Sequence, residues 1–177
     1  MEKTDRRILK SKKAIQCTFL SMLIEDGFDE ITVKEITEIA DISRKTFYLH
    51  YVDKYDLLDT IVTQRLQELE VICEQKKEAG FIEGTIIWFD YFAQHKAFFL
   101  ALFTSKSTVA FRERLLDFMM KQLGEKITER DDKILLRFVS TAVLGIMESF
   151  VLNQLNGNTE EIATKVGELM LKTIKEI

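Results

Sequence analysis

Apolar residues recur at helical spacing along almost the whole chain, and no proline interrupts the pattern in 177 residues. Glycine, the other residue that ends helices, occurs only 7 times. Sandwiches and barrels need many turns rich in these two residues, so the sequence predicts an all-α fold with long helices. Hydrophobic residues make up 46% and charged residues 31%, which is typical of a globular protein and argues against a disordered one.

Capping and turn residues divide this pattern into nine expected helices. Thr32 with Glu35 three residues later forms a capping box, and Ser43 and Asp53 each stand at the start of a further helix. Near the carboxyl end, Asn158 with Glu161 repeats the capping pattern. The expected helices cover about 5–26, 32–40, 43–51, 53–77, 82–94, 96–103, 108–124, 131–154 and 159–176.

Positive charge gathers in two places, although the net charge is −4. Residues 1–13 hold six basic and two acidic side chains, which gives a local charge of +4. A second patch consists of Arg44, Lys45 and Lys54. Because salt screens distant charges within about 10 Å, such patches can attract nucleic acid to an acidic protein. The amino-terminal arm either follows DNA or is a solubilising tail, and the sequence leaves both open.

Residues 33–51 have the pattern of a helix-turn-helix unit. Ile36, Ala40, Ile42, Phe47 and Tyr51 lie at the spacing that packs two short helices together. The second helix then exposes donor side chains at the end that can reach base edges in a major groove. The predicted DNA-binding residues are Thr32, Ser43, Arg44, Lys45, Thr46, Tyr48, His50 and Lys54.

Different chemistry is expected of these residues. Arg44 or Lys45 can bond guanine, and Thr46 can touch a thymine methyl group or a phosphate. Tyr48 and His50 suit phosphate oxygens. Backbone N–H groups at Thr32 and Lys54, where two helices begin, are expected to hold phosphates from either side.

The segment from Ile36 to Leu58, with its Thr-Phe-Tyr-x-His core, resembles the DNA-binding signature of the TetR family of bacterial transcription regulators. The likeness covers about residues 8–60. It implies an amino-terminal DNA-binding domain (1–54), a linking helix (about 53–77) and a carboxyl-terminal domain (78–177) that dimerises and often binds an effector. It also implies a regulator, expected to be a repressor, that binds a palindromic operator as a homodimer. Asp41 replaces the usual glycine of the turn. Because aspartate tolerates the left-handed backbone conformation better than most residues, the turn is expected to form.

Aromatic and methionine residues concentrate in the carboxyl-terminal region and are candidates for an apolar effector pocket. They equally suit a filled core, and the sequence does not separate the two possibilities. The candidates are Trp88, Tyr91, Phe92, His95, Phe99, Phe103, Phe118, Met147 and Phe150. The expected ligand is a small apolar or aromatic molecule.

The last two helices have apolar stripes that predict a dimer interface formed by two helices from each chain. Packing within one chain is the alternative. The interface candidates are Val139, Val143, Ile146, Ile162, Val166, Leu169, Met170 and Thr173.

Other function classes find little support. The two histidines lack metal-binding spacing, no phosphate-binding glycine loop is present, and no serine or cysteine has an evident activating partner. Cys17 and Cys73 are expected to be buried thiols. We therefore expect no enzyme activity, cofactor or metal. The longest uncharged runs have 11 residues, and Met1–Lys13 is no secretory start, so we expect a cytoplasmic protein without a membrane partner.

Two alternatives to an effector-controlled regulator remain. One is an adaptor that keeps the fold but no longer reads specific DNA, which weak dependence of DNA affinity on salt would indicate. The other is a constitutive DNA-binding protein with a solid core, which no small apolar compound would stabilise against heat.

Overall fold

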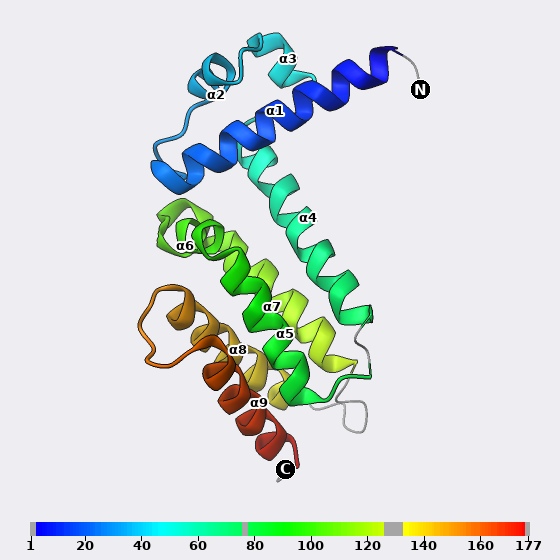
Figure 1. Ribbon diagram of the computed structural model, residues 1–177, viewed down its shortest axis with the longest axis vertical. Coiled ribbons are helices and arrows are strands. Elements are labelled where there is room, and N and C mark those ends of the chain that lie inside the picture. Colours follow the sequence, from blue (N-terminus) through cyan, green and yellow to red (C-terminus); the bar gives the residue numbers. More distant parts are fainter. Residues whose placement is uncertain (1–2, 76–77, 126–132, 176–177) are drawn as a thin grey trace.

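The structure is a computed structural model that describes residues 3–75, 78–125 and 133–175, and all regular elements in these ranges are helices. Three helices form the amino-terminal part: α1 (Lys3–Glu25), α2 (Val33–Ile39) and α3 (Arg44–Tyr48). Helix α4 (Lys54–Gln75) then leads from this part into the remainder of the chain (Figure 1). The chain thus has the all-α fold that its spacing of apolar residues predicts.

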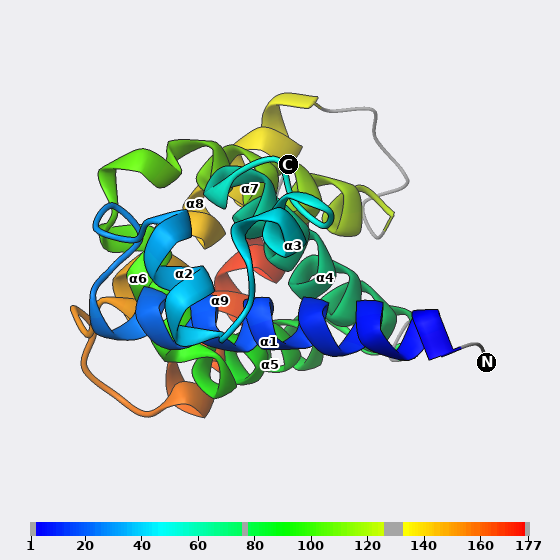
Figure 2. The ribbon, with the colours of Figure 1, turned by 90° about the horizontal axis from the view of Figure 1, so that it is seen from above.

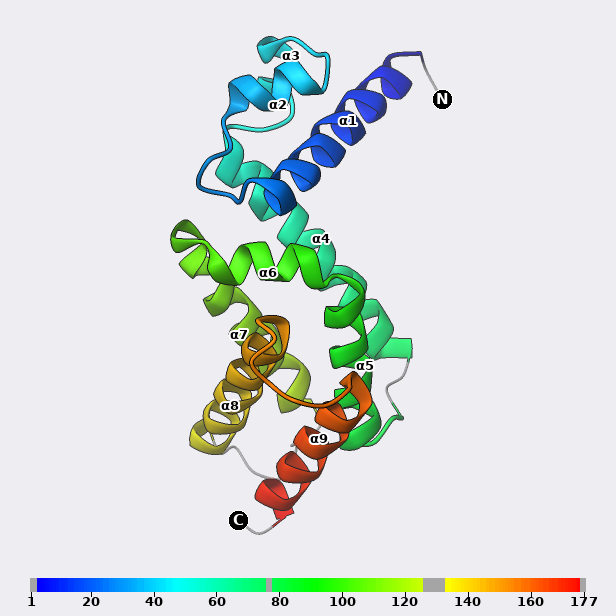
Figure 3. The same cartoon turned by 60° about the vertical axis from the view of Figure 1, so that its left-hand side comes forward.

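The carboxyl-terminal part is a helical bundle. It comprises α5 (Phe81–Gln94), α6 (Lys96–Thr104), the short 3₁₀ helix η1 (Lys106–Thr108), α7 (Val109–Gly124), α8 (Lys133–Val151) and α9 (Thr159–Lys175). Helix α6 crosses below the carboxyl-terminal end of α1, so that the two parts meet there as well as along α4 (Figures 1 and 3). Viewed from above, the amino-terminal end of α1 projects beyond the bundle (Figure 2).

Helix α9 packs most closely against α5, and a glycine makes this possible. A Cβ atom on Gly167 would lie 2.7 Å from the Cα atom of Ile82, which is closer than real contacts allow. Across the same contact, the hydroxyl of Thr85 donates to the sulfur of Met170. The backbones of α5 and α9 can therefore approach this closely only because Gly167 has no side chain.

Helix boundaries agree with the sequence expectations within a few residues, with two notable differences. Helix α3 ends at Tyr48, three residues before the expected end, and Leu49 caps it. The expected helix at 131–154 is described as Lys133–Val151, and Asn153 has a positive φ of 56° that turns the chain. The expected ends at 77 and 176 and the expected start at 131 lie outside the described residues.

Within the described ranges, α8 is the one helix long and apolar enough to cross a membrane by length and composition alone. Its inner side consists of residues such as Leu135, Val139, Val143 and Met147, all of which are buried in the bundle. The apolar character of α8 therefore reflects its place in the protein core on one side, while Ile134 and Phe138 add apolar residues on its exposed side.

Candidate nucleic-acid interface

The capping residues expected from the sequence start both short helices. The hydroxyl of Thr32 accepts from the backbone N–H of Glu35, and the carboxylate of Glu35 accepts from the N–H of Thr32 at 3.1 Å. At α3, the hydroxyl of Ser43 accepts from the N–H of Thr46 at 3.0 Å. Because Glu35 already uses the Thr32 N–H, this group is not available to a phosphate, contrary to the sequence expectation.

Asp41 makes the turn between α2 and α3. It has the left-handed φ of 52° that the sequence predicted for this position. Behind it, the N–H of Ile42 donates to the carbonyl of Thr37 at 3.0 Å. Thr37 is buried, and its hydroxyl bonds the carbonyl of Lys34 within its own helix, so the helices pack without leaving that hydroxyl unpaired.

Apolar and aromatic side chains hold the two short helices in place. Ile36 and Phe47 are completely buried, and the ring of Phe47 lies 5.7 Å from that of Tyr51. Further back, Ile15 and Phe19 of α1 are buried in the same core. Of the packing residues predicted from the helical spacing, Ile36, Phe47 and Tyr51 are buried and Ala40 and Ile42 are half-buried, while the opposite side of α3 is exposed.

The outward side of α3 carries the predicted base-reading residues. Arg44 and Lys45 are exposed, and Tyr48 is 57% exposed with its ring against the edge of Phe47. Thr46 is half-buried, and its hydroxyl lies 2.8 Å from that of Ser43. A guanidinium, an ammonium and a phenol group on one exposed helix have the chemistry that contacts bases and phosphates.

His50 does not simply face solvent. Its Nε2 atom lies 2.7 Å from the hydroxyl of Ser11 on α1, a contact between residues far apart in sequence that no local pattern indicated. Burial lowers the pKa of His50, and the positive charge of Lys12 lowers it further. The contact fixes the end of α3 against α1, whose exposed Arg6, Arg7 and Lys10 extend the positive surface.

The side chain of Lys54 points back into the protein. Its ammonium group donates to the carbonyls of Phe28, Asp29 and Ile31 at 3.1, 3.1 and 2.8 Å, and lies 4.7 Å from the centre of the Phe28 ring. An ammonium group has three N–H donors, so these carbonyls use all of them. The side chain of Lys54 is thus held by the loop between α1 and α2 rather than presented to DNA.

Most of the predicted effector-pocket residues fill the core of the bundle. The rings of Phe92 and Phe99 stack with centres 4.0 Å apart, and the ring of Phe111 stacks with that of Phe99 at 6.0 Å between centres. Phe118 is half-buried beside Trp88, at 6.3 Å between ring centres. The residues buried in this core are Trp88, Tyr91, Phe92, Phe99, Phe103, Met147 and Phe150.

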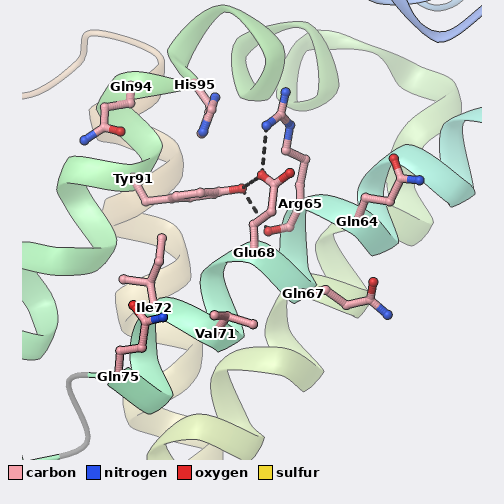
Figure 4. A pocket seen from close by; sticks show the side chains of 10 residues that line it. All are labelled: Gln64, Arg65, Gln67, Glu68, Val71, Ile72, Gln75, Tyr91, Gln94 and His95. Atoms are coloured by element: carbon pink, nitrogen blue, oxygen red, sulfur yellow. Dashed lines mark hydrogen bonds and ion pairs between the residues drawn. The ribbon is translucent and has the colours of Figure 1, made fainter. Parts of the chain in front are cut away.

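An open cleft of about 760 Å³ lies between α4 and α5, and Tyr91 and His95 are the two predicted residues that line it (Figure 4). The hydroxyl of Tyr91 lies within hydrogen-bond distance of the carbonyl of Arg65 (2.9 Å) and the carboxylate of Glu68 (3.0 Å). Burial raises the pKa of Tyr91, as does the adjacent Glu68. Arg65 and Glu68 form an ion pair at 2.8 Å, so the opposite charges of the cleft cancel.

Apart from the Arg65–Glu68 ion pair, the lining of the cleft is polar and uncharged. Burial lowers the pKa of His95, as does the charge of Arg65, so the ring is neutral at neutral pH. The remaining lining residues are mainly amides, with a short apolar strip: Gln64, Gln67, Val71, Ile72, Gln75 and Gln94. This lining differs from the apolar pocket that the sequence predicted.

The predicted interface residues divide between the inside and the outside of the bundle. Val139, Val143, Val166 and Met170 are buried within the single chain and belong to its core. Ile146, Ile162 and Thr173 are half-buried, and Leu169 is 48% exposed.

Helix α8 also exposes apolar residues, and the largest of them, Ile134 and Phe138, are not among the predicted interface residues. Phe138 is 62% exposed and Ile134 more so, and the exposed Ala142 and Gly145 follow at helical spacing. We call Ile134, Phe138, Ala142 and Gly145 the outer face of α8. Apolar residues occur on both sides of this helix, so spacing alone could not separate the outer face from the buried one.

Metal-binding chemistry is not evident among the described residues, where no group of three or more His, Cys, Asp or Glu side chains could hold a metal ion. The expectation of two buried thiols was wrong for Cys17, which is exposed on α1. Cys73 is half-buried, and its sulfur accepts from the indole N–H of Trp88 at 3.1 Å.

Comparisons with known proteins agree with this geometry. Residues 20–61 match the model of the bacterial regulatory proteins of the tetR family, and residues 81–172 match that of a transcriptional regulator C-terminal region of the same family. The uncharacterized HTH-type transcriptional regulator YxbF of Bacillus subtilis (strain 168) is 38% identical over 66 residues. That match spans 37% of this chain and 17% of the relative.

Solved structures share the fold over nearly the whole chain. A TetR transcriptional regulator from Streptococcus agalactiae 2603V has a TM-score of 0.73 at 23% identity, with coverage of 94% of this chain and 97% of that one. The dihydroxyacetone kinase operon activator DhaS has a TM-score of 0.72 at 20% identity, with the same coverage. Together with the family models, the helix-turn-helix unit and the carboxyl-terminal bundle show that this chain belongs to the TetR family of bacterial transcriptional regulators.

Proposed function

We propose that the chain is a sequence-specific regulator that binds a palindromic operator as a homodimer in the cytoplasm. Residues 1–54 would bind DNA, and residues 78–177 would dimerise and respond to an effector, with the helix over about 53–77 between them. The proposal rests on the exposed side of α3, which carries Arg44, Lys45 and Tyr48. Ser43 caps this helix, and Phe47 on its inner side is buried.

Seven of the eight predicted DNA-binding residues have a proposed role that their environment supports; the exception is Lys54, whose side chain is held by the loop between α1 and α2. Arg44 and Lys45 would contact base edges, while Thr46 and Tyr48 would contact a thymine methyl group or phosphates. Ser43 starts the recognition helix. His50 and Thr32 would lie near the phosphate backbone, with His50 held by Ser11 and Thr32 by its capping box.

The test starts with selection of an operator from random duplex DNA, followed by gel-shift titration of variants. We expect Arg44→Ala and Tyr48→Ala to weaken operator binding about ten- to a hundredfold, since one good base contact is worth about 1–3 kcal/mol. Lys165→Ala, which removes an exposed charge on α9, is the matched control and should leave binding unchanged. Weak binding to all sequences, unaffected by these variants, would instead indicate the adaptor function.

The homodimer is supported by the outer face of α8, an exposed apolar strip on a helix beside α9. Apolar strips of this kind are commonly covered by a second subunit. Two copies related by a twofold axis would place α8 and α9 of each chain together, and would present two recognition helices to the two halves of a palindrome. Leu169 and Thr173 of α9 would lie at the edge of this contact.

We propose that the chain represses transcription, because a dimer bound to an operator that overlaps a promoter blocks RNA polymerase. The similar structure DhaS is named as an operon activator. A reporter gene placed behind the selected operator distinguishes the two: repression requires lower expression with the chain than without it, and higher expression identifies an activator.

The cleft between α4 and α5 is the proposed effector site. Amide side chains and a neutral imidazole donate and accept hydrogen bonds without net charge, and Val71 and Ile72 add an apolar strip. A small, uncharged ligand with several hydroxyl or amide groups fits this lining better than the apolar molecule predicted from the sequence. A ligand there would contact both α4 and α5 and so bias the inclination of α4.

Thermal-shift measurements with neutral carbohydrates and nucleosides test this site. A ligand at a hundred times its Kd stabilises the folded state by about 2.7 kcal/mol, which is readily measured as a higher Tm. We expect the shift to disappear in Gln67→Ala and Gln94→Ala but to persist in Gln154→Ala, outside the cleft. Stabilisation by apolar compounds alone would contradict the proposal.

A further inference from the structure

The loop between α1 and α2 is held from both sides, once by the DNA-binding part and once by the bundle. From α4, the ammonium group of Lys54 donates to three carbonyls of this loop. From the bundle, the hydroxyl of Ser105 and the N–H of Lys106 donate to the carboxylate of Asp29 at 3.1 and 3.3 Å. One short loop thus connects the first residue of α4 with the end of α6.

The electrostatics of the loop keep this connection intact at neutral pH. Hydrogen bonding by Ser107 and Ser105 and the positive charge of Lys54 lower the pKa of Asp29, so its carboxylate is ionised. Ser105 is itself fixed, because it is buried and its hydroxyl also accepts from the N–H of Ser107 at 3.2 Å. The loop therefore meets a rigid corner between α6 and η1.

The contact at this corner limits how far the DNA-binding part can tilt relative to the bundle. Helix α4 contains 22 residues and is about 33 Å long, and it is the covalent path between recognition helix and bundle. A long helix fixed only at its far end allows the DNA-binding part to tilt. The contact of α6 with the end of α1 supplies a second point of attachment (Figures 1 and 3).

We infer that Lys54, Asp29 and Ser105 form a joint that sets the angle between the DNA-binding part and the bundle, and with it the separation of the two recognition helices in the dimer. The inference rests on the proposed function, because a separation exists only in a dimer on a two-part operator. Lys54 is in this view a positioning residue and makes no phosphate contact through its side chain.

Two measurements separate this role from a phosphate contact. A lysine that neutralises one phosphate contributes about 0.9 to the slope of log affinity against log salt concentration. We expect Lys54→Met to leave this slope unchanged, whereas Lys45→Met, on the exposed side of α3, lowers it by about one. A reduced slope in Lys54→Met would assign Lys54 to DNA and overturn the inference.

The second measurement is discrimination between operator spacings. It uses the operator selected by the wild-type protein, the same operator with one base pair added or removed between its halves, and a single half-site. We expect Asp29→Asn and Lys54→Met to reduce the preference for the selected spacing about fivefold or more, with half-site affinity unchanged. A merely structural defect would lower affinity for all four DNAs alike.

Ser105→Ala gives an independent variant, because it changes the joint from the bundle and leaves the bonds of Lys54 in place. It should reduce spacing discrimination in the same direction, and Ser149→Ala on α8 is a control that should not. Wild-type discrimination in every joint variant overturns the joint alone. A wild-type protein that selects no two-part operator overturns the proposed function, and the joint with it.

Discussion

At the scale of single residues, the two histidines couple stability to pH. Burial lowers the pKa of both His50 and His95, and nearby Lys12 and Arg65 lower it further. Near and below the ordinary value of 6.5, the unfolded chain therefore binds more protons than the folded one. Folding stability is fully present above this value and is lost as the pH falls through it toward the lowered pKa values.

We accordingly expect the free energy of unfolding to decrease between about pH 7.5 and pH 5.5. Urea unfolding at a series of pH values measures it, and His50→Asn and His95→Asn should each flatten part of the dependence. An unchanged pH profile in the double variant would show that other groups cause it.

Residue roles could be predicted from the sequence where they depend on near neighbours. The Thr32–Glu35 box, the Ser43 cap and the left-handed Asp41 each follow from residues within a few positions, and the structure confirms all three. Lys54 and His50 could not be placed in this way. Their partners, such as Ile31 and Ser11, are 23 and 39 positions away, and only the packing of whole helices brings them together.

At the scale of elements, the contact between α5 and α9 depends on Gly167. We expect Gly167→Ala to lower the free energy of unfolding by about 1–3 kcal/mol, because the new methyl group forces the two backbones apart. Denaturant unfolding measures the loss. Gly124→Ala, whose methyl group would make an ordinary 3.6 Å contact with Leu136, is the control and should not destabilise. Equal effects of the two substitutions would contradict the close approach.

The start of α9 offers a second test on an element. The side chain of Asn158 accepts from the N–H of Glu161 at 2.9 Å, and Glu161 accepts in return from the N–H of Asn158 at 3.0 Å. We expect Asn158→Ala to cost about 1 kcal/mol of stability in thermal unfolding, with Asn156→Ala, in the preceding loop, as a neutral comparison. A neutral Asn158→Ala would mean that the capping box contributes nothing measurable.

The sequence predicted the helices better than it predicted their orientation. Helical spacing and caps locate α8 and α9, but α8 is apolar on two sides, and no spacing rule says which side the bundle buries. The structure buries Val139 and Val143 and exposes Phe138. Similarly, an aromatic-rich segment is compatible with a pocket or a core until the stacked rings of Phe92 and Phe99 are seen to fill the space.

At the scale of the whole molecule, the outer face of α8 is expected to hold the dimer together. Phe138→Glu places a charge in the centre of this face, and we expect it to convert the dimer to a monomer in sedimentation velocity at micromolar concentration. Val109→Glu changes an equally exposed apolar residue on α7 and should leave the dimer intact. A dimer that persists in Phe138→Glu would place the subunit contact elsewhere.

Basic side chains of α7 form ion pairs with both α4 and α8. Arg114 pairs with Asp59 and Lys121 with Glu70, both on α4, while Arg112 pairs with Glu148 of α8 at 2.5 Å. In the proposed homodimer, these pairs would connect α8, at the subunit contact, through α7 to α4, so that a shift of one subunit against the other would reach α4 without any small molecule. These pairs are partly solvent-exposed, so ionic strength acts on them directly. We expect quaternary rearrangement and operator release to respond together to a change in the salt content of the cell.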